Sequence, residues 1–75
     1  MDPGQAFGQV LRRVRKDAGL TQEQLSLEAE VERNFVSLIE RGINQPTIRV
    51  LFKLAKALGT TPSQMLLEVE AEVGE

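Results

Sequence analysis

Three glycines divide this chain into blocks of helical pattern. Gly19, Gly42 and Gly59 each follow a stretch in which apolar residues recur at the spacing of an amphipathic helix. Glycine suits these positions because the residue after a helix often takes a left-handed backbone conformation. The alternating pattern typical of β-strands does not occur in the sequence. We therefore expect an all-α fold with five helices and no sheet.

Capping signals locate the first two helices. Asp2 before Pro3 predicts the start of the first helix, because proline is favoured at the first helical position. Thr21 and Gln24 have the spacing of a capping box, in which each side chain bonds a backbone amide at the helix start. This box predicts a second helix from residue 22 to about residue 29. The apolar face of the first helix comprises Phe7, Val10, Leu11 and Val14.

Similar signals locate the other three helices. The third helix should begin after residue 32 and end before residue 42, with Val36 and Ile39 facing inward. Thr47 predicts the cap of the fourth helix, and Thr61 with Gln64 predicts a capping box for the fifth. The fourth is expected to be the central core helix, with an apolar stripe of Ile48, Leu51, Phe52, Ala55 and Leu58.

The chain has the length of one domain, residues 1–75. With 75 residues, 41% of them apolar, it could not build two cores that each bury enough surface. A core of this size contributes about 3 to 5 kcal/mol, so such domains often gain stability by self-association. We expect a homodimer, and the fifth helix, about 62–72, has more apolar residues than one face can bury. The alternative is that this helix only closes the core. The candidate dimer-interface residues are Met65, Leu66, Leu67 and Val69.

Two missing residue types limit the chemistry. The chain has no cysteine and no histidine, which excludes disulfides, thiolate chemistry, the usual zinc sites and a histidine base. It also lacks a glycine-rich phosphate loop and an identifiable carboxylate pair, so we expect no enzyme activity, cofactor, metal or small-molecule ligand. No basic leader and no apolar run of about 20 residues is present, which favours a soluble cytoplasmic protein without a membrane segment.

The charges are unevenly distributed along the chain. The net charge is -2, which by itself argues against nucleic-acid binding. However, residues 68–75 contain four glutamates, the last of them Glu75, whereas all nine Lys and Arg lie between Arg12 and Lys56. Without this acidic tail the chain has nine basic and seven acidic side chains, a net of +2. The body of the protein is therefore compatible with DNA, and the tail is expected to lie away from it.

Residues 21–41 have the outline of a helix-turn-helix, with the turn at about residues 29–32. In this motif the second of two short helices enters the major groove of DNA. The surrounding sequence is specific: LTQEQL begins at Leu20, V-x-R-x-x-V-S-x-I-E-R-G at Val31, and P-T-x-x-x-L-x-x-L-A-x-A-L-G at Pro46. Through these segments the chain resembles the XRE family of phage Cro and repressor proteins. Within that family it is most similar to the controller proteins of restriction-modification systems.

The resemblance implies a λ-repressor-like domain of five helices in which the third helix reads DNA. Arginine can pair with guanine and asparagine with adenine through two hydrogen bonds, each pair discriminating by about 1 to 3 kcal/mol. Arg15 and Glu40 match family positions that form a structural ion pair, which is costly to break when buried. The implied base contacts are Arg33, Asn34, Ser37 and Leu38, and the implied phosphate contacts are Thr21, Gln22, Arg41, Asn44 and Gln45.

Some of these residues have a second interpretation. A solvated helix face would also account for Arg33 and Asn34. The basic side chains of residues 12–16 could face DNA, but the first helix of such domains lies behind the recognition helix, which favours a solvated or structural role. Phe35 could contact DNA or pack, and packing is favoured because an exposed aromatic side chain is costly.

Three residues depart from the family pattern near the turn. Glu30 stands where glycine is usual, so it predicts a strained or reshaped turn. Ser26 replaces the customary alanine where the two helices cross. Glu32 replaces a serine or threonine cap, so capping of the third helix should be weaker, although a negative charge suits the helix dipole.

Two functions from different classes fit the sequence. The first is a repressor or activator that binds a palindromic operator as a homodimer, with recognition helices about 34 to 36 Å apart. Such a protein would be regulated by its own concentration, as the resemblance to self-regulating controller proteins implies. The second is an antitoxin-like or adaptor module, which uses the same fold to bind another protein and binds DNA weakly.

Overall fold

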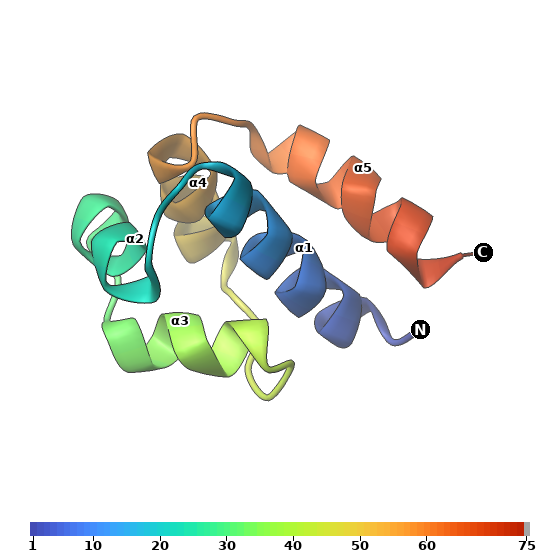
Figure 1. The fold of residues 1–75 in the computed structure, drawn as a ribbon. Helices are drawn as coiled ribbons and strands as arrows, with labels where there is room; N and C mark the ends of the chain where they lie inside the picture. Colours follow the sequence, from blue (N-terminus) through green and yellow to red (C-terminus); the bar gives the residue numbers. More distant parts are fainter. Residues whose placement is uncertain (75) are drawn as a thin grey trace.

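The computed structural model describes residues 1–74, and Glu75 of the acidic tail lies outside them. The described chain contains five helices and no strand, which confirms the predicted fold class. Figure 1 shows α1 between α3 and α5. The helices are α1 (Pro3–Asp17), α2 (Gln22–Ala29), α3 (Arg33–Glu40), α4 (Ile48–Ala57) and α5 (Pro62–Val73).

The predicted caps account for four of the helix starts. The side chains of Asp2, Thr21, Thr47 and Thr61 each accept a hydrogen bond from the backbone amide three residues later. The capping box at Thr21 is complete, because Gln24 Oε1 accepts from the Thr21 amide at 2.9 Å. At Thr61 the structure shows only the first half of the expected box. Glu32, as expected, makes no side-chain cap for α3.

The core is formed by one face of every helix. Its largest fully buried side chains are Val10, Leu11, Leu25, Val36, Ile39, Leu54 and Met65. α1 packs against both α3 and α5, α2 packs against α3 and α4, and α4 also contacts α5. The inward faces predicted for α1 and α3 are confirmed, with Val14 half-buried at the edge.

The predicted core stripe of α4 was partly wrong. Leu51, Ala55 and Leu58 are buried, but Ile48 is 70% exposed and Phe52 is 59% exposed. The buried arc of α4 is centred on Leu51, Leu54 and Ala55, and the apolar stripe continues around the helix beyond that arc. Helical spacing alone does not show where contact with neighbouring helices ends.

α1 crosses the end of α3 at Gly8. A Cβ atom on Gly8 would lie 2.8 Å from the carbonyl oxygen of Glu40 and closer still to that of Ile39. Only glycine leaves room for this approach of two backbones. The crossing fixes the end of α3 relative to α1. Within residues 1–74, no helix combines the length and the apolar character required to cross a membrane.

Candidate nucleic-acid interface

α3 lies along one edge of the molecule, with α1 and α2 on its inner side (Figure 1). Val36 and Ile39 are fully buried and anchor the helix to the core. No other helix of residues 1–74 covers the opposite face, so a long polymer could approach α3 from that side. This is the geometry that a recognition helix requires.

The four residues proposed for base contact occupy the outer side of α3. Arg33 and Asn34 are exposed in its first turn, while Ser37 and Leu38 are half-buried one turn later. The face therefore presents a guanidinium, an amide, a hydroxyl and an apolar group, which together match the donors, acceptors and methyl groups of base edges. Phe35 is half-buried and packed against the core, as the packing interpretation predicted.

The turn before α3 is closed by an unusual residue. Glu30 has a φ of 56° and a ψ of 46°, the left-handed conformation that the sequence suggested. The Val31 amide donates to the Ser26 carbonyl at 3.0 Å and ends α2 there. Ser26 is buried, and its hydroxyl donates to the Glu23 carbonyl at 2.7 Å. This closed turn sets the angle between α2 and α3.

The end of α3 leads into a loop with further polar groups. Gly42, with a φ of 76°, lets the Ile43 amide donate to the Leu38 carbonyl at 3.0 Å. Arg41 and Gln45 are exposed, and Asn44 is half-buried. The Gln45 amide lies against Gly4 at the start of α1. These side chains extend the polar surface beyond the recognition helix.

The beginning of α2 lies beside the end of α3. The capping box uses the amides of Thr21 and Gln24, and the structure gives no acceptor for the amides of Gln22 and Glu23 within residues 1–74. Unpaired amides and the positive end of the helix dipole favour an anion such as phosphate. Gln22 Nε2 also donates to Glu40 Oε1 at 3.1 Å. The sequence did not indicate this bond, because no local pattern joins residues that lie so far apart in the chain.

The predicted ion pair between Arg15 and Glu40 is confirmed. Arg15 Nε donates to Glu40 Oε2 at 2.6 Å, and Arg15 Nη2 donates to Glu40 Oε1 at 3.0 Å. The two side chains are 10% and 3% exposed, so the pair is buried. Arg15 Nη1 also donates to the Leu20 carbonyl at 2.8 Å. One guanidinium thereby joins α1, the end of α3 and the loop before α2.

Arg13, part of the basic face of α1, is engaged by α5. Its two terminal nitrogens bond Glu68 at 2.9 Å and Glu72 at 2.8 Å. The hydrogen bonds to Glu68 and then to Glu72 raise the pKa of Arg13. The structure thus supports the structural role for this residue. It also holds two of the acidic tail residues against α1 rather than α3.

The family pattern for helix-turn-helix domains matches residues 11–65, which include α2, α3 and α4. The chain belongs to the helix-turn-helix family. It is a DNA-binding transcription regulator of the XRE type, as its sequence resemblance predicted.

Named helix-turn-helix relatives cover most of the chain. It is 33% identical over 66 residues to the uncharacterized HTH-type transcriptional regulator y4dJ of Sinorhizobium fredii, covering 88% of this chain and 86% of that one. It is 36% identical over 61 residues to the control protein C.BamHI of Bacillus amyloliquefaciens, covering 80% and 75%. The crystal structure of the restriction-modification controller protein C.AhdI of Aeromonas hydrophila matches with a TM-score of 0.79 and 36% identity, covering 81% and 92%.

The helix-turn-helix domain has an apolar surface on α4 and α5. Ile48, Phe52, Leu66 and Leu67 are exposed, and we call these four residues the α4–α5 apolar face. Phe52 and Pro62 line an open groove of about 430 Å³ where α4 turns into α5, and Leu66 follows Pro62 by one helical turn. The sequence predicted a dimer interface on α5 alone.

Two of the residues predicted for that interface are not available to a partner. Met65 is 0% exposed and Val69 is 7% exposed, because both lie on the face of α5 that closes the core. Leu66 and Leu67 remain on the surface. The core-closing interpretation of α5 therefore holds for Met65 and Val69, while a dimer interface at Leu66 and Leu67 stays a prediction.

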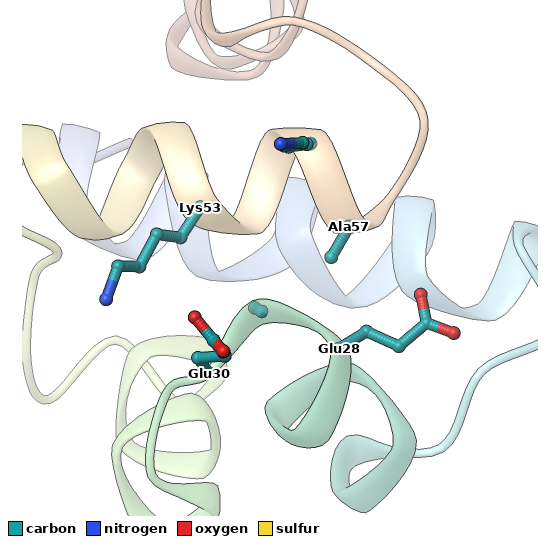
Figure 2. Close-up of a pocket in the computed structure, with 6 residues that line it drawn as sticks. Glu28, Glu30, Lys53 and Ala57 are labelled. Carbon is teal, nitrogen blue, oxygen red and sulfur yellow. The ribbon is translucent and has the colours of Figure 1, made fainter.

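A shallow cleft of about 370 Å³ separates the end of α2 from α4 in the helix-turn-helix domain. Figure 2 shows Glu28 and Glu30 on one side of it, with Lys53 and Ala57 on the other. The carboxylates and the ammonium groups of Lys53 and Lys56 form no direct ion pair among the described side chains. The two walls of the cleft therefore have opposite charges, but the charged groups do not converge on one position where a ligand could bind.

Proposed function

We propose that this protein is a transcription regulator that binds a palindromic operator as a homodimer and reads it with α3. The observation that supports this most is the exposed face of α3, where Arg33, Asn34, Ser37 and Leu38 stand on a helix anchored by two buried residues. In the family to which the chain belongs, this helix enters the major groove. Arg33 and Asn34 would supply most of the discrimination between bases.

Phosphate contacts would hold the helix in register on the DNA. Thr21 and Gln22 stand at the start of α2, where two backbone amides have no acceptor among residues 1–74. Arg41, Asn44 and Gln45 lie beyond the other end of α3. Contacts on both sides of the recognition helix would fix its depth and direction in the groove, because phosphate contacts orient a protein and base contacts specify the sequence.

The α4–α5 apolar face is the surface that would join two copies of the chain. Its four residues are exposed in the single chain, and Phe52 shares a groove with Pro62 at the start of α5. Large exposed apolar side chains of this kind often mark an interface. This face lies on α4 and α5, whereas the DNA contacts lie on α2, α3 and the following loop. Self-association here would leave both recognition helices free. A two-fold dimer would then require an operator with two-fold symmetry.

A role as a controller of restriction-modification genes is the finer form of this proposal. Its support is the similarity to proteins named as control or controller proteins. The whole chain, 1–75, would act as one domain in the cytoplasm, with about 21–41 binding DNA and the exposed side of α5 joining the dimer. The protein would then regulate genes through its own concentration, because dimer formation and operator occupancy both follow mass action.

Selection from randomised DNA duplexes tests this function directly. The wild-type protein should enrich an inverted repeat whose half-sites lie about one helical turn apart, and the complex should contain two protein chains. Enrichment of no sequence at physiological salt would contradict the proposal. That outcome, together with a stable complex with another protein, would favour the adaptor function that the apolar face also fits.

A further inference from the structure

A short series of hydrogen bonds connects the buried ion pair to the proposed DNA surface. Glu40 accepts two bonds from Arg15 and a third from Gln22 Nε2, the last at 3.1 Å. The side chain of Glu40 is 3% exposed, whereas Gln22 is half-buried. A buried carboxylate at the end of α3 thus bonds a partly exposed amide at the start of α2.

The chemistry of this bond determines which end of the Gln22 amide faces Glu40. Ionised carboxylate oxygens only accept hydrogen bonds, so they attract the NH₂ end of the amide and repel its carbonyl oxygen. Nε2 has a second N–H group that Glu40 does not use. The backbone amides of Gln22 and Glu23 lie at the same helix end. A phosphate oxygen there would meet several donors.

The charge of Glu40 does not work against this arrangement. A lone carboxylate near the DNA backbone would repel phosphate. Here the guanidinium of Arg15 bonds both oxygens of Glu40, at 2.6 Å and 3.0 Å, so the buried pair has no net charge. The pair can therefore orient Gln22 without a negative charge facing the DNA.

We propose that Glu40 is a positioning residue for DNA binding: it bonds one N–H group of Gln22 Nε2 and so holds the second N–H group toward a phosphate. The inference rests on the proposed function, in which the start of α2 contacts the DNA backbone. The sequence resemblance gave Glu40 only a structural role as the partner of Arg15. The bond to Gln22 adds an effect on affinity that is the same for every base sequence.

The test uses the duplex selected by the wild-type protein and a set of duplexes in which single phosphates are replaced by neutral methylphosphonate. Wild-type protein should lose roughly tenfold in affinity at one phosphate in each half-site. Gln22→Met should reduce that sensitivity and leave the part that the backbone amides of residues 22 and 23 supply. Glu40→Gln should reduce it in the wild-type background and add nothing further to Gln22→Met.

Other outcomes separate this inference from the function on which it rests. If Glu40→Gln weakens binding by the same factor on every duplex and adds fully to Gln22→Met, Glu40 is structural only and the inference is overturned. If no duplex is selected at all, the proposed function fails and the inference fails with it.

A second measurement covers the case in which Glu40→Gln does not fold. In the wild-type protein, NMR should show one Gln22 Nε2 proton protected from solvent exchange, as its bond to Glu40 requires. The chemical shift of the second Gln22 Nε2 proton should change when the unmodified duplex binds. It should not change when the bound duplex has the sensitive phosphate neutralised. Free exchange of both protons would overturn the inference.

Discussion

At the scale of single residues, the turn between α2 and α3 depends on Glu30. Its φ of 56° is positive, and every other described residue with a positive φ is a glycine. A residue with a Cβ atom is less stable in this conformation than glycine. The turn next to the recognition helix therefore keeps its shape at a cost to the stability of the folded protein.

Replacing Glu30 with glycine should stabilise the protein by about 1 kcal/mol, because the left-handed conformation then has no steric cost. Urea unfolding at a fixed protein concentration measures this change. Glu30→Ala is the matched control, since it removes the same charge and keeps the strain. Equal stability of the two variants would show that the charge, and not the backbone, matters at this position.

At the scale of helices, the position of α3 depends on its crossing with α1. Gly8 touches the backbone of Ile39 and Glu40, and Arg15 holds the same end of α3 two helical turns further along α1. Both contacts act on the end of α3 from which Arg41 and the polar loop follow. Their disruption would move the proposed DNA contacts.

Gly8→Ala should destabilise the protein by about 1 to 3 kcal/mol, although alanine is the better helix former, because its Cβ would force α1 away from α3. Thermal unfolding followed by circular dichroism measures the loss. Gln9→Ala, at an exposed position on the same helix, should change stability by less than about 0.5 kcal/mol. A stabilising effect of Gly8→Ala would mean that the two helices do not meet so closely.

Local signals in the sequence predicted the helices well, and contacts between helices less well. The caps at Asp2, Thr21, Thr47 and Thr61 act within a few residues, so the sequence contains the information that places them. The exposure of Phe52 depends on where α4 meets its neighbours, and periodicity cannot show this.

The same contrast applies to the candidate site. The family pattern indicated the pair of Arg15 and Glu40, and the structure confirms it. The bonds of Gln22 to Glu40 and of Arg13 to α5 join residues distant in the chain, and no motif contained them. The proposed contacts of α3 and α2 with DNA stay predictions.

At the scale of the whole molecule, the proposed surfaces are divided between its helices. In the proposal, α2 and α3 would provide the polar surface for DNA, while α4 and α5 would provide the apolar face for a second copy. α5 also carries Glu68 and Glu72, which hold Arg13. A dimer through α4 and α5 would therefore keep the acidic end of the chain away from the recognition helices.

Phe52→Ser should weaken the proposed dimer at least tenfold. A large aromatic side chain buried in an interface often contributes roughly 2 kcal/mol or more to binding. Sedimentation velocity across a range of concentrations measures the change. Leu27→Ser is the control, since Leu27 is 73% exposed on α2, outside the α4–α5 apolar face. Dissociation by Leu27→Ser and not by Phe52→Ser would place the interface elsewhere.

The measurement that tests the central claim most directly compares wild type with Arg33→Ala on the selected duplex and on every single base-pair variant of it, at one salt concentration. Arg33→Ala should lose about 1 to 3 kcal/mol of discrimination at one base pair in each half-site and keep its preference elsewhere. Arg12→Ala, on the exposed face of α1, should keep the full preference. Undiminished discrimination by Arg33→Ala at every position would contradict the assignment of α3 as the helix that reads DNA.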